Sequence, residues 1–204
     1  TIMAVNCLIY WGSSALTAGR YHYGFTMAFD REVPLLPVFV WFYILAFPFW
    51  AVGYLLATRR GKDMFYRFVA TDLTIHFICF ICFILIPTTN IRPEIPGNTL
   101  SEKILALVYS LDGGNSPSNL FPSIHCYVSW MCWKGVEGSE KVPKWYQRFS
   151  LVFAILIIIS TQVLKQHYIV DAAAALLLVE FFWRFYQKGQ RHKWVVHIFS
   201  HKKK

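Results

Sequence analysis

Residues 149–171 read FSLVFAILIIISTQVLKQHYIVD, an apolar run followed by a short segment with a lysine, a histidine and an aspartate. A membrane-spanning helix needs about 20 mainly apolar residues, so this run is close to the length that crosses a bilayer. Ionisable side chains at membrane depth are costly and mark functional sites. His167 and Asp171 lie at the end of a predicted span and are therefore the first candidates for function.

The composition indicates an integral membrane protein. Of the 204 residues, 56% are hydrophobic and only 15% are charged, whereas soluble domains contain about 25% charged residues. The formal charge of +9 does not indicate nucleic-acid binding, because the basic residues lie in short segments between apolar runs. No segment outside these runs is long enough for a separate soluble domain. We expect one membrane domain over residues 1–204, with a basic cytoplasmic tail over 188–204.

The apolar segments predict an all-α integral membrane bundle of six transmembrane helices. They cover residues 1–18, 36–57, 68–87, 120–136, 149–164 and 167–187. Cytoplasmic loops of membrane proteins are enriched in lysine and arginine. The 58–67 loop, the 134–148 loop and the residues from Arg184 onward hold 15 of the 20 basic residues. We therefore expect both termini in the cytoplasm and a multi-pass protein of a plasma membrane; the compact chain favours a bacterial inner membrane.

The polar residues gather at the other, extracytoplasmic end of the predicted spans. They are Arg92 after the third span, Ser123 and His125 at the start of the fourth, and Lys165, His167 and Asp171 at the turn into the sixth. The orientation rests on other residues, so this gathering is an independent indication of a site.

The histidines suit phosphoryl transfer. His167 and Asp171 are four residues apart on one helix face, so the carboxylate can fix the imidazole tautomer and leave the other nitrogen free to attack. His125 can protonate the departing oxygen. A polar pair that bridges two helices explains His167 and Asp171 equally well. Zinc binding is disfavoured because no third histidine lies in the predicted spans at that end, so we expect no metal and no cofactor.

Three further residues are candidates for holding phosphate. Ser123 lies at the start of a predicted helix, and helix N-termini bind anions. Arg92 and Lys165 supply positive charge for phosphate oxygens. Each also has a simpler explanation, since Ser123 can be a helix cap, Arg92 a surface residue and Lys165 an interfacial side chain.

These residues resemble the motifs of the type 2 phosphatidic acid phosphatase (PAP2) superfamily, lipid phosphatases whose fold is shared with vanadium haloperoxidases. The family pattern is Lys-x6-Arg-Pro, then Pro-Ser-Gly-His, then Ser-Arg-x5-His-x3-Asp. The matching residues, in the same order and over about residues 68–187, are Arg92-Pro93, Pro122-Ser123-Ile124-His125, and Ser160, His167 and Asp171.

The resemblance implies a PAP2/haloperoxidase-like core and a phosphatase that needs no metal. His167 would form a phosphohistidine, Asp171 would orient it and His125 would be the general acid. The residues that would hold phosphate are Arg92, Ser123 and Ser160.

Two positions depart from the family pattern. Leu85 stands where the family has its first lysine, and Thr161 stands where it has the arginine of the third motif. Lys165 follows Thr161 by four residues, one turn along the same face if the helix continues. We therefore expect Lys165 to replace the missing arginine.

The reaction allows more than one product. The Phe-Pro-Ser-x-His motif over residues 121–125 and the segment from His167 to Ala175 also resemble the inositol-phosphorylceramide and sphingomyelin synthases, which pass a phospho-headgroup to another alcohol instead of to water. Three residues of the 88–120 loop could bind such an acceptor, although turn-forming residues are common in loops: Asp112, Asn115 and Asn119. A non-catalytic lipid-phosphate binder is the remaining alternative. The expected partners are a lipid phosphate and membrane lipids, and the oligomeric state stays open.

Overall fold

The computed structural model describes residues 2–114 and 117–200, with side chains over 9–114 and 117–198. These residues form helices joined by loops and contain no strand, which confirms the predicted all-α class for them. The elements are α1 (Ile2–Thr17), α2 (Ala28–Glu32), η1 (Pro37–Phe39), α3 (Val40–Ala57), η2 (Thr58–Arg60), α4 (Lys62–Leu85), α5 (Leu100–Leu111), α6 (Ile124–Val136), α7 (Lys144–Val163), α8 (Ile169–Gln187) and α9 (Lys193–Ser200). Residues 201–204 of the predicted basic tail lie outside the described part.

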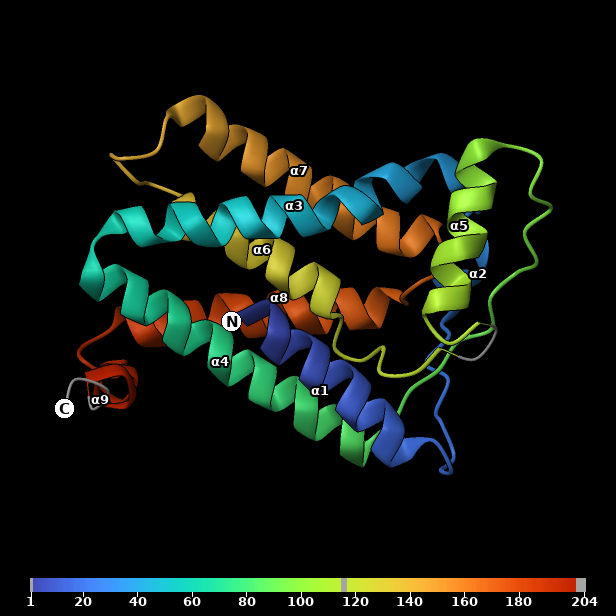
Figure 1. Cartoon of the computed structure of the whole chain (residues 1–204), viewed down its shortest axis with the longest axis horizontal. Helices are drawn as coiled ribbons and strands as arrows, with labels where there is room; N and C mark the ends of the chain where they lie inside the picture. The colour runs from blue at the N-terminus through green and yellow to red at the C-terminus, as the bar shows by residue number, and fades with distance from the viewer. Residues whose placement is uncertain (1, 115–116, 201–204) are drawn as a thin grey trace.

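The long helices α1, α3, α4, α6, α7 and α8 run roughly side by side, and α6 packs against α3, α4, α7 and α8 (Figure 1). Short α5 lies across the end of the bundle where α6 and α8 begin, and α9 lies at the opposite end. This arrangement brings the start of α6, the end of α7 and the start of α8 together beneath α5.

Within the described residues, three helical segments are long and apolar enough to cross a membrane: Pro37–Arg60, Lys62–Leu85 and Lys144–Val163. They correspond to the second, third and fifth predicted spans. Helices α1 and α6 have only 16 and 13 residues, and α8 carries Asp171, Glu180 and Arg184. The apolar helices fit a membrane protein, whereas the count of six spans is not confirmed and stays a prediction.

Residues 88–120, expected to form a loop, contain helix α5. Thr99 caps this helix: its hydroxyl accepts a hydrogen bond from Glu102 N at 3.2 Å, and the Glu102 carboxylate accepts one from Thr99 N at 3.0 Å. Leu105 and Tyr109 are the buried side chains of this helix and form its inner face. A helix of 12 residues is too short to span a bilayer, so apolar runs of spanning length do not reveal it. The same reason applies to α2 and α9.

Helices α3 and α6 pack closely because α3 carries a glycine at the crossing. A Cβ added to Gly53 would lie 2.6 Å from Cys132 Sγ of α6. We expect Gly53→Ala to lower the free energy of unfolding by about 1–3 kcal/mol, since an overpacked core must shift. Thermal unfolding of the detergent-purified protein measures this. Gly12→Ala in α1 is the matched control, because nothing lies within 4 Å of its added Cβ; equal midpoints for both variants would contradict the prediction.

Candidate active site

The starts of α6 and α8 meet through a backbone hydrogen bond. Ser123 is the N-cap of α6, and its hydroxyl accepts from Cys126 N at 3.3 Å. Ser123 N in turn donates to the carbonyl oxygen of Asp171 in the first turn of α8, at 3.2 Å. The ring centroids of His125 and His167, one on α6 and one just before α8, lie 6.2 Å apart. Two histidines that are 42 residues apart in the sequence thus face the same small space.

Asp171 holds His167. Its Oδ2 lies 3.3 Å from His167 Nδ1 and accepts a hydrogen bond from Tyr168 N at 2.9 Å. The side chain is completely buried, and its Oδ1 has no hydrogen-bond partner among the described residues. A carboxylate on Nδ1 requires a proton there, so Nε2 of His167 is left as the nitrogen with a free lone pair.

His125 lies among aromatic rings of α3. It stacks on Tyr43 with ring centroids 4.3 Å apart and an interplanar angle of 16°, and it meets the edge of Trp50 at 5.0 Å. Its Nε2 is buried and has no hydrogen-bond partner within the described residues. The rings fix the imidazole plane, and the unpaired nitrogen is available to a ligand.

A cavity of about 270 Å³ adjoins both histidines. One wall is aromatic and comes from α1 and α3: Tyr10, Trp11, Tyr43, Phe47 and Trp50. The lining also contains the polar residues Asp112, Ser118, Asn119 and Gln166. A mainly apolar lining with a few polar groups suits a ligand with an apolar chain and a polar head.

Arg92 is buried behind this cavity and does not line it. Its Nη1 donates to the carbonyl oxygens of Asp112 and Gly114, both at 3.0 Å, and its Nη2 donates to the Asp112 carboxylate and to Gln166 Oε1. The guanidinium also lies over the ring of Tyr109, 4.6 Å from its centroid. Only Nε lacks a partner among the described residues. Arg92 therefore contacts the cavity only through Asp112 and Gln166, which both line it.

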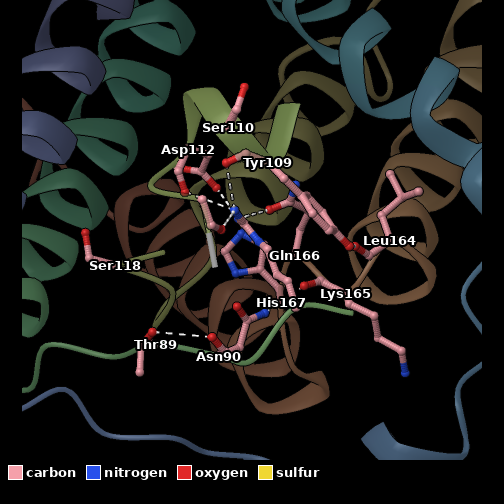
Figure 2. A network of polar contacts seen from close by, with 12 residues as sticks. Thr89, Asn90, Tyr109, Ser110, Asp112, Ser118, Leu164, Lys165, Gln166 and His167 are labelled. Carbon is pink, nitrogen blue, oxygen red and sulfur yellow. Dashed lines mark hydrogen bonds and ion pairs between the residues drawn. The ribbon is translucent and has the colours of Figure 1, made fainter. Parts of the chain in front are cut away.

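Lys165 and Ser160 are not brought to the histidines. Helix α7 ends at Val163 and Lys165 has a φ of 52°, so the helical continuation on which the expected role of Lys165 depended does not occur. Its ammonium group donates to Asp30 O at 2.7 Å and to Val33 O, and Figure 2 shows the side chain running away from His167. Ser160 is buried within α7 and donates to Ile157 O at 2.6 Å.

The sequence contained no signal for the role of Asp30. This buried carboxylate of α2 accepts from Met27 N at 2.7 Å with one oxygen. With the other it accepts from Ile169 N, the first residue of α8, at 2.9 Å. It thus stabilises the N-terminus of α8 from outside that helix, as an acidic group at a helix start does. Its only local pattern is a short capping motif, which does not reveal a partner 139 residues away.

We expect Asp30→Ala to destabilise the protein by about 1–3 kcal/mol, because two partly buried backbone N–H groups lose their acceptor. Thermal unfolding in detergent checks the loss. Asp30→Asn retains two acceptor lone pairs on one oxygen and should recover only part of it. Wild-type stability in Asp30→Ala would show that the acidic cap is unimportant.

No cluster of three or more His, Cys, Asp or Glu side chains that could hold a metal ion occurs in residues 2–114 and 117–200. The polar groups that line the cavity include two imidazoles, the Asp112 carboxylate and the amides of Asn119 and Gln166, and the buried Asp171 carboxylate lies behind His167. This set can attack phosphorus, donate a proton and hold an oxygen atom.

Comparison with known families agrees with this geometry. The family model of the PAP2 superfamily matches residues 21–184, about four-fifths of the chain. No curated protein and no solved structure matches. The matched range contains His125, His167 and Asp171. It covers the helices α2 to α7 completely and α8 up to Arg184. The chain therefore belongs to the PAP2 superfamily.

Proposed function

We propose that this protein removes a terminal phosphate from a membrane lipid through a phosphohistidine on His167. The observation that supports this most directly is the pair of imidazoles, 6.2 Å apart between ring centroids, that line one largely apolar cavity. Membership of the PAP2 superfamily supports phosphatase-type chemistry. The aromatic wall of the cavity favours a substrate with an apolar chain.

The spacing of the histidines suits a phosphoryl group placed between them. A nucleophile approaches phosphorus to about 3 Å, and a general acid lies about 3 Å from the oxygen that it protonates. His167 Nε2 forms the bond to phosphorus, the bond from phosphorus to the lipid oxygen breaks, and His125 supplies the proton to that oxygen. Water then cleaves the phosphohistidine and releases inorganic phosphate.

The proposed setting is a bacterial plasma membrane crossed six times by a single domain. Both termini would lie in the cytoplasm and the cavity at the extracytoplasmic face. This is supported by the separation of charges along the bundle, because the basic connection between α3 and α4 lies at the end opposite to the start of α6 and α8 (Figure 1). The partners are then the lipid substrate and the surrounding lipids.

Phosphate release by the detergent-purified protein tests the proposal. The panel consists of phosphatidic acid, phosphatidylglycerol phosphate and undecaprenyl diphosphate, each with and without diacylglycerol or ceramide. Release from any of them without an added acceptor supports a phosphatase and ranks its substrates. A panel without either phosphate release or a new lipid contradicts it and leaves the non-catalytic binder.

A headgroup transferase is the second candidate, and one feature of the cavity favours it. Asp112 and Asn119, two of the loop residues that could bind an acceptor, line the same cavity as the histidines, and Asn119 Oδ1 has no partner among the described residues. Asn115 lies outside the described residues. In this case a new phospholipid forms only when an alcohol acceptor is added, and free phosphate stays at background.

A further inference from the structure

The amide of Gln166 is an unused hydrogen-bond donor at the cavity. The side chain is only 2% exposed and lines the cavity together with His125 and His167. Its Nε2 is buried and has no acceptor within the described residues. A buried N–H group without a partner is costly, so its presence here indicates an acceptor that a ligand supplies.

Arg92 fixes which end of this amide faces the cavity. The guanidinium carries only donors, so the Gln166 atom that contacts its Nη2 must be the carbonyl oxygen Oε1. The NH₂ group of Gln166 then points the other way. The amide cannot flip without setting donor against donor, and Arg92 therefore orients Gln166 without reaching the cavity itself.

Gln166 is also close to the place where the family has its third-motif arginine. The carbonyl oxygen of Thr161, which occupies that position, accepts from Gln166 N at 2.9 Å and from His167 N at 3.1 Å. These two hydrogen bonds to one carbonyl oxygen turn the chain back at the end of α7. Gln166 and His167 therefore both lie beside Thr161. The same turn directs Lys165 outward to Asp30 and Val33.

We propose that Gln166 Nε2 donates a hydrogen bond to a non-bridging oxygen of the phosphoryl group on which His167 acts, in the place of the absent arginine. This inference rests on the proposed function in naming a phosphoryl ligand. A neutral donor supplies less attraction than a guanidinium, and Arg92 behind it polarises the amide through Oε1. Arg92 is in this sense a positioning residue, and Gln166 is the group that touches the substrate.

Binding of orthovanadate and of inorganic phosphate to the full-length protein tests this without turnover. Gln166→Met removes the donor and the acceptor for Arg92, whereas Gln166→Glu keeps an acceptor for Arg92 and removes the donor. Gln162→Glu is the matched control for charge: it lies one turn earlier, donates to Thr161 Oγ1 at 3.0 Å and does not line the cavity. Titration calorimetry and the ligand-induced rise in unfolding temperature give the affinities.

We expect both Gln166 variants to lose roughly 10- to 100-fold in affinity, because each loses a hydrogen bond to a charged group. Gln162→Glu should stay within a few-fold of the wild type, and Gln166→Glu should unfold at or above the wild-type temperature. Wild-type affinity in either Gln166 variant overturns the inference, as does a wild-type protein that binds neither anion. Anion binding that depends on Gln166 without any lipid hydrolysis supports the inference and refutes the phosphatase.

Discussion

Replacing His167 by alanine is expected to reduce kcat/KM by about 10⁴-fold or more, because the variant has no group to form the covalent intermediate. His167 is the imidazole that Asp171 holds with its Nδ1 at 3.3 Å, so its other nitrogen is the one prepared to attack. The backbone around it does not depend on the side chain, since His167 N donates to Thr161 O and Tyr168 N donates to Asp171 Oδ2. The variant should therefore fold with a nearly unchanged unfolding temperature.

Two measurements separate a nucleophile from a residue that only shapes the cavity. The first is phosphate release by His167→Ala, with His22→Ala as control, because His22 lies outside the cavity lining. The second is trapping of a phosphoenzyme from ³²P-labelled lipid, whose acid lability and base stability identify phosphohistidine. Label that remains in His167→Ala, or a rate above one-tenth of wild type, would assign the attack to another group.

The sequence predicts those parts of the site that depend on spacing within one helix or on the order of apolar runs. The run over 149–164 and the pair formed by His167 and Asp171 are of this kind, and the structure places them on α7 and at the start of α8. The start of α6 is also close to the prediction, with Ser123 as the cap and His125 in the first turn. Apolar runs and i,i+4 spacing are local, so a single chain without relatives is enough to find them.

The parts that the sequence does not predict depend on where a helix ends. Extending α7 by one turn would put Lys165 on the face of Thr161. The helix instead ends at Val163, and the turn that follows exchanges the expected positions of Lys165 and Gln166. Lys165 leaves the site and Gln166 enters it. The turn after α7 is held by contacts within it and from outside it, among them Asn90 Nδ2, which donates to Lys165 O at 2.7 Å. Such contacts between distant segments leave no periodic trace in the sequence.

Asp171→Asn is expected to lower kcat by roughly 10²- to 10⁴-fold while the protein stays folded. Tyr168 N donates to Asp171 Oδ2 at 2.9 Å, so the new amide must turn its oxygen toward that N–H or lose the bond. With one side-chain oxygen committed in this way, its NH₂ group can only offer a proton to His167 Nδ1. The imidazole then carries its own proton on Nε2, and the nitrogen that should attack phosphorus has no free lone pair.

The protein contains a matched control for this argument. Asp72 and His76 in α4 have the same i,i+4 spacing, with Asp72 Oδ2 3.5 Å from His76 Nδ1, and the Tyr54 hydroxyl donates to Asp72 at 2.6 Å. Both residues are buried but neither lines the cavity. Asp72→Asn should therefore change the unfolding temperature and leave kcat within a few-fold of the wild type. Asp171→Asn should lower kcat and leave the unfolding temperature nearly unchanged. Equal losses of kcat in both variants would mean that Asp171 acts through stability, and that His167 needs no carboxylate to choose its tautomer.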